Sequence, residues 1–169
     1  AYSVTATGAS LFENDTTVTS IVLPSTLLSI ATKFAMRASN LTSVTFDGTP
    51  TVTTINESAF HITGITSFTI PASVTTIGTA ILASTNITTL TIPDTVVGTI
   101  KSTIYDCDQI VSFYIGTGVT IVDGYTVYHN AKLETVHFGK NAFVYGDNLK
   151  YLPKLKKVTF SSLYNTYGY

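Results

Sequence analysis

One seven-residue pattern returns seven times along the chain, and it constrains the fold more than any other feature. It reads VTSIVLP at residue 18, LTSVTFD at 41, ITSFTIP at 65, ITTLTIP at 87, IVSFYIG at 110, LETVHFG at 133 and LKKVTFS at 155. The starts are 22 to 24 residues apart. A period of this length is typical of a solenoid, in which each repeat is one coil and buries its apolar face against its neighbours.

The first half of each repeat predicts a short strand. Positions 1, 4 and 6 are apolar, as in Ile65, Phe68 and Ile70, and position 5 is polar. This alternation is the period of a strand with one buried face. In three repeats a proline follows at once, at Pro24, Pro71 and Pro93, where it would end the strand.

The second half of each repeat has apolar residues near positions 10, 13 and 17. Examples are Leu27, Ile30 and Phe34; Val74, Ile77 and Ile81; and Val96, Ile100 and Ile104. These segments are short and rich in Thr, which disfavours a helix. We expect either a second short strand or a single 3₁₀ turn on the outer side of each coil.

Stacking the repeats predicts one parallel β-ladder with an inward column at position 4. That column is Ile21, Val44, Phe68, Leu90, Phe113, Val136 and Val158. Residues 1–169 then form a single repeat domain with little α-helix. Its boundaries are a partial repeat over 1–17, repeats that start at 18, 41, 65, 87, 110 and 133, and a partial repeat over 155–169.

The wording of the repeats resembles the BspA-like leucine-rich repeat family. The closest stretches are LTSVTF…VTTINESAF over 41–60 and ITSFTIPASVTTIGTAI over 65–81, and Cys107 stands three residues before Ile110 as a cysteine often does in that family. The resemblance implies a leucine-rich-repeat solenoid that is secreted or held at the cell surface. It also implies adhesion or protein recognition rather than catalysis.

Composition excludes several classes of partner. Only 11% of the residues are Asp, Glu, Lys or Arg, and the net charge is -1, so no basic surface favours nucleic acid or an anionic membrane. The sequence contains no run of 18 apolar residues, so it does not predict a membrane-spanning helix. The one cysteine excludes an internal disulfide framework. Low charge with abundant Thr and Ser favours an extracellular or cell-surface location.

Positions 3 and 5 of each strand point away from the core and predict a binding face. We expect its contact residues to be Ser67, Thr69, Thr89, Thr91, Ser112, Tyr114, Thr135, His137 and Lys157. Tyr114, His137 and Lys157 interrupt the run of Ser and Thr and are the favoured contacts. The alternative is that Ser and Thr only suit exposed strand positions. A Thr array on a flat sheet also allows ice binding, although Tyr114 interrupts the array.

The C-terminal third differs from the rest by its tyrosines. Nine of the ten tyrosines lie from Tyr105 onward. Tyr125, Tyr128, Tyr145 and Tyr151 are expected on outer turns, where they form either an interface or ordinary packing. A small basic cluster follows at Lys150, Lys154, Lys156 and Lys157, and sequons for N-glycosylation occur at Asn14, Asn40, Asn56 and Asn86.

No residue pattern predicts catalysis, a cofactor or a metal. His61, His129 and His137 lack the spacing of metal ligands, and a single D-x-D at 106–108 is weak evidence for calcium. Cys107 is expected to be buried in a turn rather than to be a nucleophile. No motif of a known hydrolase or nucleotide-binding enzyme occurs. The sequence therefore predicts a protein that is not an enzyme.

Two hypotheses about partners remain open. The first is a recognition module that binds a host or partner protein. The second is a structural subunit that stacks end to end with copies of itself into a filament or layer. The sequence begins and stops inside a repeat, without the charged terminal caps that usually protect a solenoid core. We therefore expect either further repeats or stacking between subunits.

Overall fold

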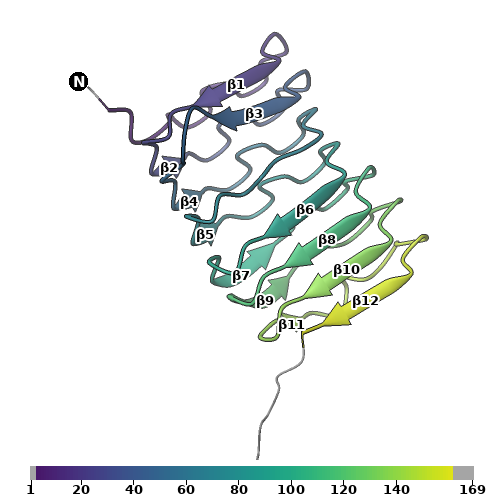
Figure 1. The fold of residues 1–169 in the computed structure, drawn as a ribbon. Coiled ribbons are helices and arrows are strands. Elements are labelled where there is room, and N and C mark those ends of the chain that lie inside the picture. The colour runs from purple at the N-terminus through teal and green to yellow at the C-terminus, as the bar shows by residue number, and fades with distance from the viewer. Residues whose placement is uncertain (1–2, 162–169) are drawn as a thin grey trace, which may run out of the picture.

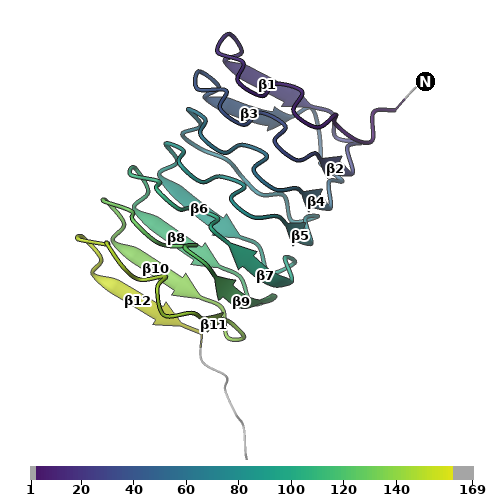
Figure 2. The same ribbon diagram turned by 180° about the vertical axis from the view of Figure 1, so that it is seen from behind.

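The computed structural model describes residues 3–161, which wind into a solenoid of stacked coils. Each coil contributes one segment to each of two faces, on which the strands pair in parallel ladders, and the apolar core lies between the two faces. Figure 1 shows the first ladder nearer the viewer, and Figure 2, turned by 180°, shows the second. None of the described segments is a helix, so the structure holds no helix able to cross a lipid bilayer.

The first ladder is built from the strands predicted in the first half of each repeat. They are β1 (Ser20–Leu23), β3 (Ser43–Phe46), β6 (Thr89–Ile92), β8 (Ser112–Ile115), β10 (Thr135–Phe138) and β12 (Lys157–Phe160). All of their pairings are parallel. β1 and β6 end directly before Pro24 and Pro93, as expected for residues that cannot donate to a ladder.

The second ladder settles the structure of the outer half of each repeat. It consists of β2 (Ser29–Ile30), β4 (Thr54–Ile55), β5 (Thr76–Ile77), β7 (Gly98–Lys101), β9 (Val119–Asp123) and β11 (Phe143–Val144). These strands pair in parallel within two groups, β2–β4–β5 and β7–β9–β11, and β5 does not pair with β7. Of the two predicted alternatives, the second short strand is confirmed. No 3₁₀ helix is formed in residues 3–161; turns join the strands instead.

The core follows the predicted columns. At position 4, the residues Ile21, Val44, Phe68, Leu90, Phe113 and Val136 are buried, and Val158 in the last described strand is half-buried. Phenylalanine rings link successive coils: Phe34 lies 6.1 Å from Phe60, and Phe60 lies 5.1 Å from Phe68, between ring centroids. Apolar burial is the main favourable contribution to this packing.

The strand predicted in the repeat that starts at 65 is absent, which corrects the sequence analysis. Residues 67–70 alternate exposed and buried as expected, yet they pair with neither β3 nor β6, so the first ladder is divided in two. Phe68 turns its ring into the core against Phe60, and a hollow of about 250 Å³ lies between residues 67–69 and β3. The repeat pattern thus predicts burial, which depends on side chains, better than backbone pairing.

The corners between the ladders have a backbone that the sequence analysis did not foresee. Twelve described residues other than glycine have a positive φ, among them Lys33, Arg37, Ser102 and Asp106. Another corner, after β10, needs glycine for space rather than for φ, because a Cβ on Gly139 would collide with the carbonyl oxygen of Gly116 in the coil before it. Here the coils approach each other too closely for any side chain.

Candidate functional site

The four strands β6, β8, β10 and β12 hold the predicted contact residues in two straight columns. The first column aligns Thr89, Ser112, Thr135 and Lys157, and the second aligns Thr91, Tyr114, His137 and Thr159. Between the columns runs the backbone of the buried residues Leu90, Phe113 and Val136. The register places the two columns on the exposed side of the sheet, as the period-two pattern predicts.

A groove of about 320 Å³ lies between these columns. It is lined by Thr89, Leu90, Thr91, Ser112, Phe113, Tyr114, Thr135, Val136, His137, Lys157 and Thr159. Seven of the nine predicted contact residues therefore come together in one groove. The other two, Ser67 and Thr69, line the separate hollow beside β3. Thr159 was not among the predicted contacts, although its position in the second column could have identified it.

Tyr114 and His137 form the aromatic centre of the groove. Their rings stack with centroids 4.5 Å apart and an interplanar angle of 2°. The two nitrogens of the imidazole are also held, because Nδ1 lies 2.7 Å from the Thr159 hydroxyl and Nε2 lies 2.9 Å from the Ser161 hydroxyl. Tyr114 remains 37% exposed. Both rings are therefore held in place by contacts within the protein.

Four hydroxyl groups of the groove differ from those on the second-ladder side, whereas Thr159 bonds to His137 and donates to the Val136 carbonyl at 3.5 Å. In the described part of the chain, the side chains of Thr89, Thr91, Ser112 and Thr135 form no hydrogen bond with another protein group. In contrast, hydroxyls on the side of the second ladder donate to backbone carbonyls of the preceding coil. This set, here called the coil-to-coil hydroxyls, comprises Thr26, Thr51, Thr53, Ser73, Thr75, Thr95 and Thr126.

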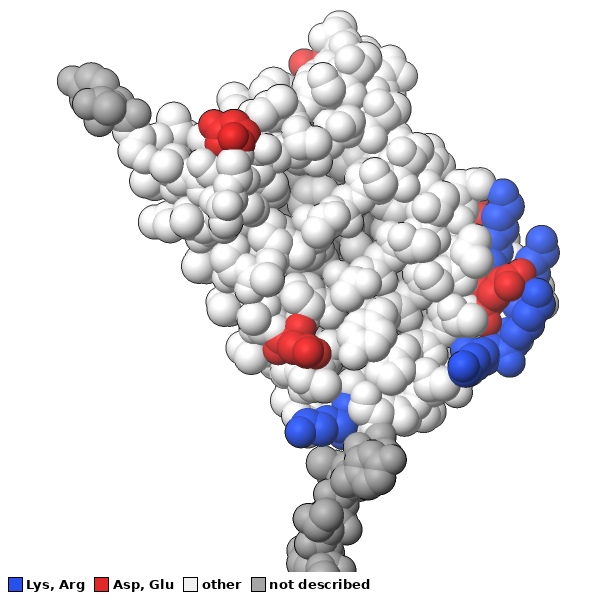
Figure 3. All heavy atoms as spheres, viewed as in Figure 1, with Lys and Arg blue, Asp and Glu red and all other residues white. Residues whose placement is uncertain are grey.

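The groove has one charged residue. Lys157 lines it and forms no ion pair within residues 3–161, whereas the adjacent Lys156 pairs with Glu134 at 2.9 Å. No Asp or Glu lines the groove. Figure 3 shows that the middle of the first-ladder face is uncharged, that charged side chains gather along one edge, and that isolated charged groups lie on the opposite side. The local field in the groove is therefore weakly positive at the β12 end.

The predicted tyrosines form a second exposed cluster, at the corners of the coils. Tyr128 contacts Tyr105, Tyr125 and Tyr151 with ring centroids 4.7 to 5.9 Å apart. Tyr145 stands apart from them beside Phe143, with centroids 5.1 Å apart. All of these tyrosines lie on turns or loops outside the first ladder. Their mutual stacking is compatible with both predicted readings, an interface and ordinary packing.

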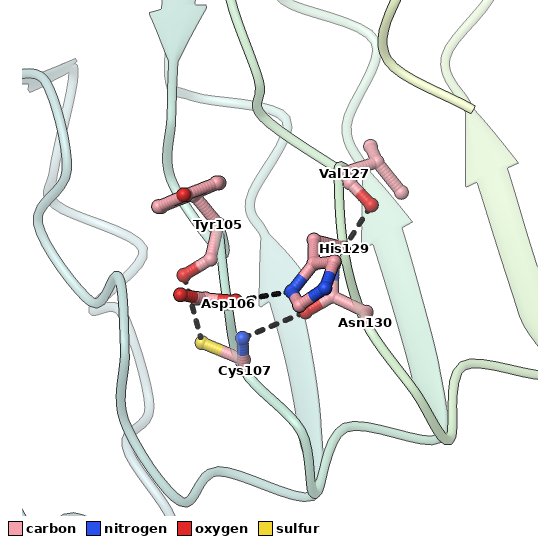
Figure 4. Close-up of polar contacts among 6 residues, drawn as sticks. All are labelled: Tyr105, Asp106, Cys107, Val127, His129 and Asn130. Atoms are coloured by element: carbon pink, nitrogen blue, oxygen red, sulfur yellow. Dashed lines mark hydrogen bonds and ion pairs between the residues drawn. The ribbon is translucent and has the colours of Figure 1, made fainter. Parts of the chain in front are cut away.

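Cys107 and its neighbours lie at the same corners of the coils and are held there by hydrogen bonds. Figure 4 shows the Asp106 carboxylate directed toward the His129 ring, with which it forms an ion pair if the ring is protonated. Asn130 accepts a hydrogen bond from the Cys107 backbone N–H at 2.8 Å and donates to the Val127 carbonyl at 2.8 Å. Cys107 is fully buried, which confirms its predicted place in a buried turn.

Burial also sets the chemistry of the Cys107 thiol. Loss of solvent raises the pKa of Cys107 to about 11, and hydrogen bonds from Thr85 offset the shift only in part. The thiolate, which is the nucleophilic form, is therefore scarce at neutral pH. The thiol instead donates to the Leu82 carbonyl at 3.1 Å. The thiol thus takes part in the hydrogen bonds that hold this turn.

The three histidines lie in different surroundings. His137 is in the groove, His129 pairs with Asp106, and His61 is half-buried near Arg37. Burial and then the Arg37 charge lower the pKa of His61. Residues 3–161 contain no group of three or more His, Cys, Asp or Glu side chains that could hold a metal ion.

The predicted basic cluster and sequons are distributed over the surface. Lys150 pairs with Asp147 at 2.5 Å and Lys156 with Glu134 at 2.9 Å, so two of the four lysines have acidic partners. Asn56 is half-buried and donates to Ser29 and to the Ile30 carbonyl. The other three sequon asparagines, Asn14, Asn40 and Asn86, are exposed. An attached glycan at Asn56 would have to break the contacts between coils.

Comparison with known families gives a match along the chain. The family model for the BspA type leucine-rich repeat region, in six copies, matches residues 1–109 and 53–169. No curated protein matches the chain in sequence.

Solved structures also resemble this solenoid. A leucine-rich repeat protein from Bacteroides ovatus is 18% identical with a TM-score of 0.49, and the alignment covers 95% of this chain and 60% of that one. A leucine-rich cell surface protein from Faecalibacterium prausnitzii is 16% identical with a TM-score of 0.41, covering 92% and 63%. The pneumococcal vaccine antigen PcpA is 16% identical with a TM-score of 0.42, covering 85% and 51%. The chain thus spans between 51% and 63% of the length of these structures.

Proposed function

Because the chain belongs to the BspA-type leucine-rich repeat family, we propose that it is a non-catalytic module for protein recognition or adhesion. Its working location is extracellular or at the cell surface, and its partner is a protein of a host or of the same surface. The partner binds in the groove between the two columns of β6, β8, β10 and β12. Low charge, abundant Thr and Ser and a single cysteine support the location.

The observation that carries this proposal is the unpartnered state of the groove hydroxyls. Coil-to-coil hydroxyls on the second ladder already donate to the protein, so they have a structural role. The hydroxyls of Thr89, Thr91, Ser112 and Thr135 remain available to a ligand, around the fixed pair of Tyr114 and His137. Aromatic residues at the centre of a polar patch are typical of binding hot spots.

Substitution of both rings tests the proposal. The variant Tyr114→Ser/His137→Ser is expected to lose capture of its partner by at least about tenfold, because aromatic hot-spot residues commonly contribute 2 kcal/mol or more. The measurement is binding of the purified chain to an array of purified extracellular proteins. A matched control, Tyr125→Ser/Tyr145→Ser, removes two exposed rings outside the groove and leaves capture unchanged. Unaltered capture by the groove variant, with its melting curve preserved, contradicts the proposal.

A second function, end-to-end stacking with further copies, is favoured by one observation. Within the described residues β12 pairs only with β10, and Phe160 at its end is 61% exposed. An unpaired strand edge with an apolar side chain is suited to association with another strand. Size-exclusion chromatography with light scattering tests this function. A monomer at every concentration contradicts stacking, whereas polymers lost in Phe160→Lys support it.

Ice binding has less support than these two functions. It needs a long and regular array of Thr hydroxyls. The first ladder is divided at residues 67–70, and Tyr114 and His137 interrupt its outer column.

A further inference from the structure

The groove has a distinct chemical polarity along its length. At the β6 end it is lined by the uncharged residues Thr89 and Thr91, and at the β12 end it is lined by Lys157. The Lys157 ammonium has no acidic partner in residues 3–161. A cation without an internal partner, in a groove without carboxylates, is complementary to an anionic group on a ligand.

The length of the groove limits the size of what it can hold. Four parallel strands are separated by three spacings of about 4.8 Å each, which gives a groove about 14 Å long. Extended polypeptide advances about 3.4 Å per residue, so the groove accommodates about four residues. The flanking hydroxyls can both donate and accept, which suits the alternating N–H and C=O groups of a peptide backbone.

The aromatic pair favours a peptide over a sugar. An aromatic ring takes a sugar by stacking one of its faces on the apolar face of the sugar ring. Tyr114 and His137 each cover one face of the other, with an interplanar angle of 2°. The register places Thr91 beside Tyr114 and Thr159 beside His137 in the same column, and the Thr159 hydroxyl meets the edge of the imidazole at Nδ1. Tyr114, which is 37% exposed, also carries a hydroxyl, a hydrogen-bonding group rather than a stacking platform.

We infer that the groove takes an extended acidic segment of the partner protein, about four residues long, with a carboxylate side chain bound by Lys157. The inference rests on the proposed function, because it names the part of the partner that the same groove holds. The binding free energy from one solvent-exposed ammonium is small and is weakened by salt. It therefore selects the ligand and its direction, while the hydroxyls and the aromatic pair supply the rest of the affinity.

The experiment uses the full chain and an array of immobilised octapeptides of Ala and Ser. Each peptide carries Glu, Gln or Lys at one position, and the array covers every position in turn. The wild-type chain is expected to bind the Glu peptides about three- to fivefold better than the Gln peptides at low salt, and the difference shrinks in 0.5 M NaCl. Lys157→Gln removes the preference, and Lys157→Glu transfers it to the Lys peptides. Lys154→Gln makes the same change in net charge outside the groove and leaves the preference intact.

The outcomes separate this inference from the proposed function. If Glu and Gln peptides bind equally and Tyr114→Ser/His137→Ser lowers both, the inference is wrong and the groove still binds protein. If no peptide binds but extracellular proteins are still captured through the groove, the inference is also wrong. Sialyllactose bound through Lys157 without any peptide binding would replace the acidic peptide by an acidic sugar. If the wild-type chain binds neither extracellular proteins nor peptides, both proposals are contradicted.

Discussion

The two faces of this solenoid use the same residue types in opposite ways. On the second-ladder side, Ser73 and Thr95 donate their hydroxyls to carbonyls of the preceding coil at 2.7 and 2.8 Å. On the first-ladder side, Thr89 and Thr91 line a groove and donate to no protein group in residues 3–161. A Thr-rich composition thus supports the structure on one face and leaves hydrogen-bonding groups available on the other.

The difference arises from where each hydroxyl stands relative to the strands. The coil-to-coil hydroxyls lie in the turns and loops that flank the short strands of the second ladder. Carbonyls there, such as those of Val52 and Val74, also lie outside the strands and accept from side chains. The first-ladder residues stand in the middle of paired four-residue strands, whose carbonyls are already bound to the next strand. Among the groove hydroxyls, Thr159 at the β12 end reaches a backbone carbonyl, that of Val136 at 3.5 Å, whereas Thr89, Thr91, Ser112 and Thr135 bond to no protein group in residues 3–161.

The largest expected effect is a loss of stability when hydroxyls are removed from the second-ladder side, and it tests the difference between the two faces directly. Removing three coil-to-coil hydroxyls, by Ser73→Ala, Thr95→Val and Thr126→Val, is expected to lower the unfolding free energy by about 3 kcal/mol. Each loss leaves a partly buried carbonyl without its donor, which costs about 1 kcal/mol. Denaturant unfolding measures the change.

The matched triple variant lies on the first ladder. Thr89→Val, Thr91→Val and Thr135→Val remove three hydroxyls without partners, so stability is expected to stay within about 0.5 kcal/mol of the wild type. The same variant weakens binding in the groove. Equal destabilisation by the two triple variants would show that the two faces do not differ.

The second prediction concerns the corner that joins the faces, at Cys107. Its pKa is raised from 9.0 to about 11 by burial. Between these values the unfolded chain loses the thiol proton and the folded chain keeps it. The contribution of Cys107 is therefore fully present below pH 9 and falls by about 2–3 kcal/mol as the pH rises through 11.

The measurement is the unfolding free energy of wild type and Cys107→Ala between pH 8 and pH 11. Tyr and Lys side chains titrate in both proteins, so the difference between the two curves isolates the thiol. The variant is expected to lose less stability over this range. Parallel curves would mean that Cys107 is accessible, and that this corner resembles the open groove rather than the tightly bonded second ladder.

The third prediction compares the two parts of the first ladder. Amides of residues 67–70 have no backbone partner, whereas β10 pairs with strands on both sides. Hydrogen exchange by NMR is expected to be at least about tenfold faster for residues 67–70 than for residues 135–138. Equal protection would mean that the first ladder is continuous in solution.

Much of the candidate site could be derived from the repeat. Period-two alternation identified the outward residues, and the 22–24-residue spacing aligned Tyr114 with His137. The stacking of these rings, the bonds from His137 to Thr159 and Ser161, and the isolation of Lys157 could not be derived. Each depends on side-chain conformation and on which neighbours of a residue already have partners, and a linear pattern contains neither.

The sequence by itself determined the coil, its period and its buried columns, because apolar spacing alone decides which side chains leave water. It could not determine where the backbone pairs. Residues 67–70 match the repeat as well as any segment yet form no strand. The tertiary structure also decided which Thr hydroxyls bind the next coil and which remain open in the groove. Hydrogen bonds need short distances and suitable angles between particular atoms, and only the stacked coils fix those.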